Sequence, residues 1–152
     1  MDSNSAEVAI LSIHPRFAEA ILNGEKRVEF RRTRFSRDVS HVVIYATQPV
    51  GKVIGWFEVA GIEVLHPDDL WKKFRHCGGI DEEDFRTYYD GRETGYAIRV
   101  RRSCRLHQPK ALTVVSPDTR PPQSFTYLNK TAVRRMLGQG GWGRASSTAP
   151  SE

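Results

Sequence analysis

The chain has 152 residues, a formal net charge of +5 at pH 7 and a sequence pI near 9.5. This length suits one domain with a buried core, and no apolar run approaches the roughly 18 residues that a membrane span requires. The N-terminus lacks the segments of a signal peptide, and two cysteines are too few for a disulfide framework. A soluble cytoplasmic protein with no membrane partner is expected. The surplus of arginine and lysine favours an anionic partner such as nucleic acid or a nucleotide.

The first third of the chain predicts three short strands and one helix. The strands are expected at residues 8–13, 26–32 and 41–47. The helix begins at Pro15, whose missing N–H costs nothing at the first helical position, and ends before Asn23 and Gly24. Residues 1–7 are predicted to be a flexible lead-in.

The middle of the chain predicts two longer strands with two helices between them. The apolar run 52–65 contains Gly55 and Gly61, and glycines inside a strand commonly mark bulges or bends. Helices are expected to begin at Pro67 and at Asp81, because acidic residues follow both positions and favour a helix start. Residues 95–103 then alternate, with Arg99 and Arg101 on the side opposite to the apolar residues.

The C-terminal part predicts a last strand at 112–115, a structured turn at 121–129 and a short basic helix at 130–137. Residues 138–152 are rich in glycine and serine and are predicted to be a disordered tail, which leaves 8–137 as the domain. Short helices between strands, with glycine-bent long strands, predict an α+β fold built on a small curved sheet or barrel.

The predicted strand 26–32 combines a core pattern with charge. Val28 and Phe30 share one face with Lys26 and Arg32, and the opposite face carries Arg27, Glu29 and Arg31. If that second face lines a cleft, its arginines can bind phosphate or a base edge, and Glu29 can accept from a base amino group. Lys26, at the mouth of the strand, is expected to be mobile enough to reach a ligand. An ordinary edge strand whose charges block edge-to-edge pairing is the alternative.

A second group of cations includes Arg99 and Arg101. If their strand neighbours 26–32, the two strands make one positive surface, and the acidic residues 81–84 make the molecule electrically polar. A solvated face balanced by those acidic residues is the alternative.

Other chemistries receive weaker support. Four potential zinc ligands occur in His76-Cys77 and Cys104-x-x-His107, but neither pair is a CxxC or HxxxH unit, so no metal or other cofactor is predicted. There is no GxSxG, Walker or HExxH motif. Lys26 and Glu29 with a nearby hydroxyl can form a nucleophile–base unit, which leaves a hydrolase open. The candidate hydroxyls are those of Thr47, Ser124 and Tyr127.

Four stretches carry a family resemblance: ILSIHPRFAEAILNGEKRVEFRR, VVIYATQPVGKVIGWFEV, GYAIRV and PPQSFTYL. They resemble the ASCH (activating signal cointegrator homology) domain of the PUA-like superfamily, and the last one resembles the ending of stand-alone prokaryotic members. The resemblance runs from Val8 to Leu128 and implies a small PUA-like β-barrel with short helices packed around it. By similarity, Lys26, Glu29 and Arg31 line a cleft that faces the first helix. Further candidates are Thr47, Gln123, Ser124 and Tyr127.

The resemblance implies RNA, another single-stranded nucleic acid or a modified nucleotide as the partner. We favour a binding module whose basic cleft uses Arg27, Arg31, Arg99 and Arg101 on phosphates. The alternative is a small hydrolase that uses Lys26 with Glu29, because the family includes amidohydrolases of acylated cytidine and ribonucleases. In the amidohydrolases a threonine hydroxyl stands where this chain has Glu29, and a carboxylate is a poor substitute for it. A protein-interaction domain with a vestigial cleft is a third interpretation.

Overall fold

The computed structural model describes residues 6–115 and 120–137, with β1 beginning inside the predicted lead-in, at Glu7. The remaining lead-in residues 1–5 and the predicted tail 138–152 lie outside the described residues. None of the described helices is long and apolar enough to cross a membrane.

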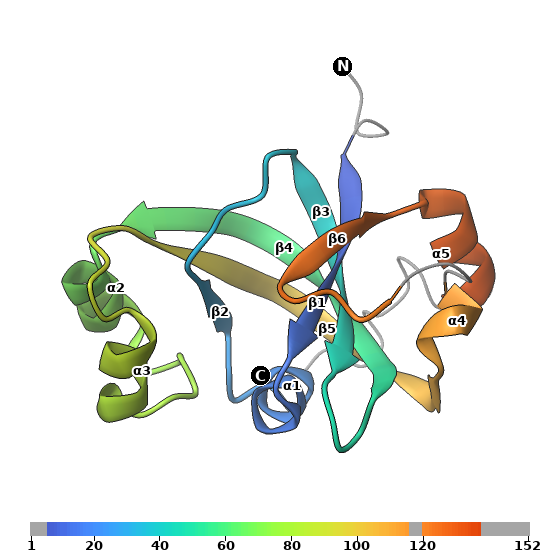
Figure 1. The fold of residues 1–152 in the computed structure, drawn as a ribbon, viewed down its shortest axis with the longest axis horizontal. Helices are drawn as coiled ribbons and strands as arrows, with labels where there is room; N and C mark the ends of the chain where they lie inside the picture. The colour runs from blue at the N-terminus through green and yellow to red at the C-terminus, as the bar shows by residue number, and fades with distance from the viewer. Residues whose placement is uncertain (1–5, 116–119, 138–152) are drawn as a thin grey trace.

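A mixed six-stranded sheet forms the frame, in the order β2-β5-β4-β3-β1-β6 (Figure 1). Its strands are β1 (Glu7–Ile13), β2 (Val28–Arg31), β3 (Val39–Ala46), β4 (Lys52–Leu65), β5 (Gly95–Lys110) and β6 (Phe125–Leu128). The β1–β3 pair is parallel and the other four pairs are antiparallel. The α+β class is therefore confirmed. In the part of the chain that the structure describes, no ladder joins β2 to β6, so the predicted closed barrel is not confirmed.

The described residues form five helices around this sheet: α1 (Pro15–Leu22), α2 (Pro67–Phe74), α3 (Glu82–Tyr88), α4 (Leu112–Val115) and α5 (Lys130–Leu137). Helices α2 and α3 lie together at one end of the molecule and α4 and α5 at the other, with α1 between them (Figure 1). Each group buries its own apolar cluster: Phe85 is central to the α2–α3 cluster, Ile21 of α1 packs with Phe57, and Leu112 of α4 packs near Trp56.

Three predicted elements differ from the structure. Residues 112–115 are wrongly predicted as a strand and form α4 instead, because Leu112 and Val115 are buried at a helical spacing while Val114 is 58% exposed. The predicted turn 121–129 contains β6, which pairs with β1. Strand β5 continues seven residues beyond the predicted end at Ser103, because the long β4 supplies pairing partners as far as Lys110.

The glycines of β4 mark irregularities, as predicted. The β4–β5 register shifts between Val53 and Gly55 and again between Val59 and Gly61. A Cβ atom on Gly55 would lie 2.6 Å from the carbonyl oxygen of Cys104 and 2.7 Å from Cδ2 of Leu22. Glycine is thus required where α1 packs onto the bent strand.

We expect Gly55→Ala to lower the free energy of unfolding by about 1–3 kcal/mol, because the added methyl group overpacks a contact with backbone that cannot move freely. Urea denaturation followed by circular dichroism measures this change. The exposed Lys52→Ala, in the same strand, should stay within about 0.5 kcal/mol of the wild type. Equal stability of the two variants would contradict the close packing of α1 on β4.

Candidate functional site

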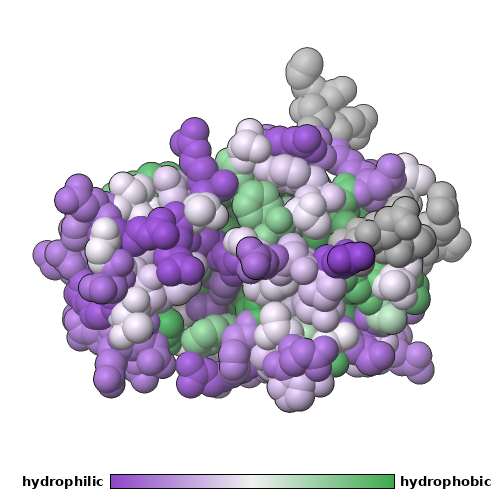
Figure 2. All heavy atoms as spheres, viewed as in Figure 1, coloured by the Kyte–Doolittle hydropathy of each residue, from purple (hydrophilic) through white to green (hydrophobic). Residues whose placement is uncertain are grey.

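A pocket of about 140 Å³ opens between the edge strand β2 and the end of β1. Its walls come from four parts of the chain: Ser12 and Ile13 at the end of β1, His14 and Phe17 at the start of α1, Lys26 with Glu29, Phe30 and Arg31 of β2, and Ile80 with Tyr88 from the α2–α3 region. Hydrophilic side chains cover most of this face of the molecule, and apolar side chains show in the hollow at its middle (Figure 2).

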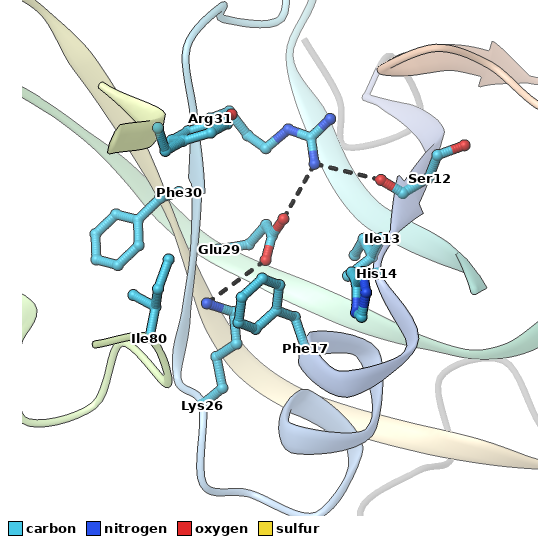
Figure 3. Close-up of a pocket in the computed structure, with 10 residues that line it drawn as sticks. Ser12, Ile13, His14, Phe17, Lys26, Glu29, Phe30, Arg31 and Ile80 are labelled. Carbon is cyan, nitrogen blue, oxygen red and sulfur yellow. Dashed lines mark hydrogen bonds and ion pairs between the residues drawn. The ribbon is translucent and has the colours of Figure 1, made fainter. Parts of the chain in front are cut away.

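An ionic cluster of three side chains forms the floor of the pocket (Figure 3). Lys26 and Glu29 are 2% and 5% exposed, and they are the buried charged residues of the described chain. The Nζ atom of Lys26 lies 3.7 Å from Oε1 of Glu29, and Nη1 of Arg31 lies 3.0 Å from Oε2. Two cations thus face one carboxylate, which leaves a formal surplus of one positive charge.

The Arg31 guanidinium joins strands that lie far apart in the sheet order. It donates to Glu29, to the Ser12 carbonyl at 3.5 Å, and to the hydroxyl and carbonyl of Ser124 at 2.8 and 3.3 Å. Tyr89 holds the backbone of the same residue, since its hydroxyl donates to the Arg31 carbonyl at 2.8 Å. These contacts connect β2 to β1 and to the segment before β6.

Lys26 is fixed in place, so the expectation of a mobile lysine is wrong. Its ammonium group donates to the Gly78 carbonyl at 2.5 Å and lies 4.9 Å and 5.3 Å from the ring centroids of Phe17 and Phe30. Burial lowers the pKa of the Lys26 amine, and the nearby Glu29 carboxylate partly opposes this change. The lysine is therefore more easily deprotonated than an exposed one.

Two glycines allow this close approach. A Cβ atom on Gly79, whose φ is +69°, would lie 2.9 Å from Cβ and Cγ of Lys26, and one on Gly78 would lie 2.8 Å from the Phe30 ring. The Arg27 N–H donates to the Cys77 carbonyl at 2.8 Å, so the chain enters β2 only at Val28. Because Lys26 precedes the strand, it joins Glu29 in the pocket rather than sharing the face of Val28 as the alternation predicted.

The structure does not bring the predicted phosphate-binding arginines together. Arg31 lines the pocket, whereas Arg27 is exposed and does not. Strand β5 does neighbour β2, but Arg99 pairs with Val28 and therefore shares its face, opposite to Glu29. Arg101 is exposed, as Arg99 is, and lies at a register shift of the β4–β5 pair. Their contact with a ligand stays a prediction.

The remaining predicted residues lie around the pocket and not in its walls. Ser124 bonds to Arg31, with the exposed Gln123 beside it. The Thr47 N–H donates to the Ile13 carbonyl at 3.0 Å, next to the pocket. The Tyr127 hydroxyl accepts from the backbone of Ser36 and Arg37 and holds the β2–β3 loop.

Four lining residues have no motif that could reveal them. Ser12 and His14 lie in a segment that looks like a buried strand followed by a helix start. Ile80 and Tyr88 belong to the α2–α3 region and reach the pocket only through tertiary packing. Burial raises the pKa of the Tyr88 phenol, which keeps its hydroxyl protonated at neutral pH.

Within residues 6–115 and 120–137, no group of three or more histidine, cysteine or acidic side chains could hold a metal ion. The pocket itself offers a buried amine, a carboxylate, a guanidinium and aromatic rings.

Comparison with known proteins identifies the family. The ASCH domain model matches residues 11–101. The chain is 33% identical over 132 residues to an ASCH domain-containing ribonuclease from Zymomonas mobilis, which covers 85% of this chain and 89% of that protein. A crystal structure of ASCH from Zymomonas mobilis matches with a TM-score of 0.79 and 32% identity, over 86% of this chain and 93% of that one. The chain therefore belongs to the ASCH domain family.

A more distant relative is a large ribosomal subunit protein, uL22, from Ureaplasma parvum. It is 27% identical over 128 residues, which are 84% of this chain and 41% of the uL22 protein.

The lowered pKa of Lys26 predicts a pH-dependent stability. The unfolded chain holds this proton up to about pH 10.5, whereas the folded chain releases it at lower pH. Between the two values the unfolded state binds more protons, so the free energy of unfolding rises with pH. We expect Lys26→Met to remove this rise, measured by urea denaturation at several pH values below 10.5. The exposed Lys52→Met should retain the rise, and parallel curves for wild type and Lys26→Met would refute the assignment.

Proposed function

We propose that this domain binds single-stranded RNA and takes one nucleotide of the strand into the pocket. The observation that carries the proposal is the buried ionic cluster of Lys26, Glu29 and Arg31 beside an open cavity. Burying each charge costs of the order of several kcal/mol, and a buried ion pair adds little net stability. A three-charge cluster placed at a cavity suits ligand recognition better than it suits stability.

Two exposed arginines at the pocket support single-stranded nucleic acid as the partner. The Arg16 guanidinium lies 4.6 Å from the ring centroid of Phe17, and that of Arg32 lies 4.7 Å from the ring of Tyr88. Both rings line the pocket, so a cation stands on each of two of its walls. Arg16 also lies 3.6 Å from the exposed Asp84 carboxylate, which a phosphate would replace as its partner. Such positions suit the phosphates on either side of a nucleotide held in the cavity.

The name of one relative favours RNA over other anions as the partner. A relative that covers most of this chain is named as a ribonuclease, and a folded RNA strand exposes bases in loops and at ends, where a pocket can take them. Binding releases counterions from the RNA phosphates, so the affinity should fall as the salt concentration rises.

We expect the double variant Arg16→Ala/Arg32→Ala to bind a single-stranded RNA about tenfold or more weakly, and to reduce the slope of log K against log salt by about 1.4, because two phosphate contacts are lost. Fluorescence anisotropy at several salt concentrations measures both, with single-stranded DNA and duplex RNA for comparison. Arg105→Ala, which removes a cation paired with Glu19 at 2.8 Å, is the control and should lower affinity by less than twofold. Absence of saturable binding to every RNA would refute the proposal.

Ribonuclease activity is the second candidate, favoured by the name of the Zymomonas relative and by the lowered pKa of Lys26. In this reaction the neutral amine of Lys26 accepts the proton of a ribose 2′-hydroxyl. The 2′-oxygen then attacks the adjacent phosphorus, and the bond from phosphorus to the 5′-oxygen breaks. The departing oxygen takes a proton from solvent, and Lys26 returns its proton to solvent. Arg16 and Arg32 at the rim offset the negative charge that develops on the phosphate.

If the protein cleaves RNA, we expect Lys26→Met to lower the cleavage rate at saturating RNA by about 100-fold or more, so that the loss of the base is separated from any loss of affinity. The wild-type rate should rise with pH, because the neutral amine is the active form. Gel analysis of end-labelled RNA measures the rate, and Lys52→Met, purified in the same way, controls for contaminating nuclease. Equal cleavage by both variants would show that Lys26 does not act as the base.

A further inference from the structure

We infer that the pocket selects guanine among the bases of RNA, through hydrogen bonds from the guanine Watson–Crick edge to the carboxylate of Glu29. This inference rests on the proposed binding of single-stranded RNA and names the base that the same pocket would take. It follows from the hydrogen-bonding groups that the protein itself leaves open.

The two cations of the pocket floor are largely engaged by the protein. Arg31 donates to Ser12, Glu29 and Ser124, and Lys26 donates to the Gly78 carbonyl. The carboxylate is in the opposite position, because an ionised carboxylate has about four acceptor sites. One oxygen of Glu29 accepts from Arg31 at 3.0 Å, and the other lies 3.7 Å from Lys26, beyond hydrogen-bond distance. Both oxygens therefore keep acceptor capacity.

The direction of the carboxylate makes this capacity available to a ligand. Glu29 lines the pocket, and its carboxylate lies between the two cations and points toward the β1 residues on the far side of the cavity (Figure 3). A phosphate at this depth would meet the carboxylate first and be repelled by it. The base of the nucleotide is therefore the part that enters, and the phosphates stay outside with Arg16 and Arg32.

The order of groups along the floor matches one base. From Lys26 to Arg31 the sequence of groups is donor, acceptor, acceptor, donor. Guanine presents an acceptor, O6, followed by two adjacent donors, N1–H and the N2 amino group. Its two donors match the two oxygens of Glu29, and O6 then lies toward a flanking cation.

The other bases fit less well. Uracil has a single N–H donor between two carbonyl oxygens, and one of these would face a carboxylate oxygen. Cytosine and adenine each present one amino group beside a ring-nitrogen acceptor, which would again oppose the carboxylate. The side chains of Ile13, Phe17 and Ile80 in the pocket walls have no polar group that could pair with such unmatched ligand atoms. A site of this kind discriminates strongly against ligands that leave its polar groups unpaired.

The first test changes only the ligand. The ligands are labelled RNA decamers made of adenosine that differ only at one central position. This position carries guanosine, inosine, 1-methylguanosine, cytidine, uridine or adenosine. Fluorescence anisotropy gives the affinity of the wild-type protein for each decamer. We expect guanosine to bind tightest. Inosine, which lacks the N2 amino group, and 1-methylguanosine, which lacks the N1 proton, should each bind at least about tenfold more weakly, because each loses a hydrogen bond to a charged acceptor.

The second test changes the protein. Glu29→Gln replaces one acceptor oxygen with an amino group that opposes a donor of guanine, so the preference for guanosine should fall to less than about threefold. Glu58→Gln is the matched control, since Glu58 is a partly buried carboxylate paired with Arg102 at 2.9 Å and does not line the pocket. Thermal unfolding of both variants shows whether the fold is kept. If Glu29→Gln does not fold, the first test still decides the inference, because it uses only the wild-type protein.

The outcomes separate this inference from the function on which it rests. Equal affinity for all decamers, or a preference for uridine, overturns the guanine assignment and leaves RNA binding intact. Undiminished binding of inosine or 1-methylguanosine overturns it as well. Absence of binding to every decamer overturns the proposed function and the inference together.

Discussion

The contacts of Arg31 hold together the part of the molecule on which the candidate site depends. Strands β2 and β6 are the two ends of the sheet order, and no ladder joins them in the described chain. One guanidinium reaches the Ser12 carbonyl, the Ser124 backbone and hydroxyl, and Glu29 on its own strand. The sheet can therefore curl without closing, and the opening that remains beside β2 is the pocket. A fully paired barrel would place backbone ladders where the cavity now lies.

The charges around this opening differ between the inside of the pocket and its rim. Inside, Glu29 offers acceptor sites between two cations whose donors are mostly taken by the protein. Outside, Arg16 and Arg32 lie on the rings of Phe17 and Tyr88 and remain close to solvent. A carboxylate at depth and cations at the rim suit a base that enters and phosphates that do not. The same arrangement would bring the buried Lys26 amine beside a nucleotide held in the pocket, where the proposed ribonuclease reaction needs a base.

Helices α2 and α3 contribute to the site through backbone as well as side chains. The glycines that follow α2 let a carbonyl group reach Lys26, and a side chain on Gly79 would collide with that lysine. The aromatic cluster around Phe85 packs this region against Phe30, which lines the pocket. A substitution in the cluster would therefore shift a pocket wall without touching the cavity itself. The geometry of the pocket thus depends on the packing of a segment distant in the chain, since Lys26 and Gly78 are 52 residues apart.

The sequence by itself determined the α+β class, most element positions and the bulges at Gly55 and Gly61, and it singled out Lys26, Glu29 and Arg31, which line one pocket. These features depend on local periodicity, on backbone freedom at glycine and on the resemblance of a short charged segment to the ASCH family. Only the tertiary structure decided that Lys26 is buried and fixed, that Arg99 faces away from Glu29, and that residues 112–115 are helical. It also supplied Ser12, Ile80 and Tyr88 as pocket walls. Strand pairing, helix docking and side-chain burial set these features, and they depend on residues distant in the sequence that no local pattern brings together.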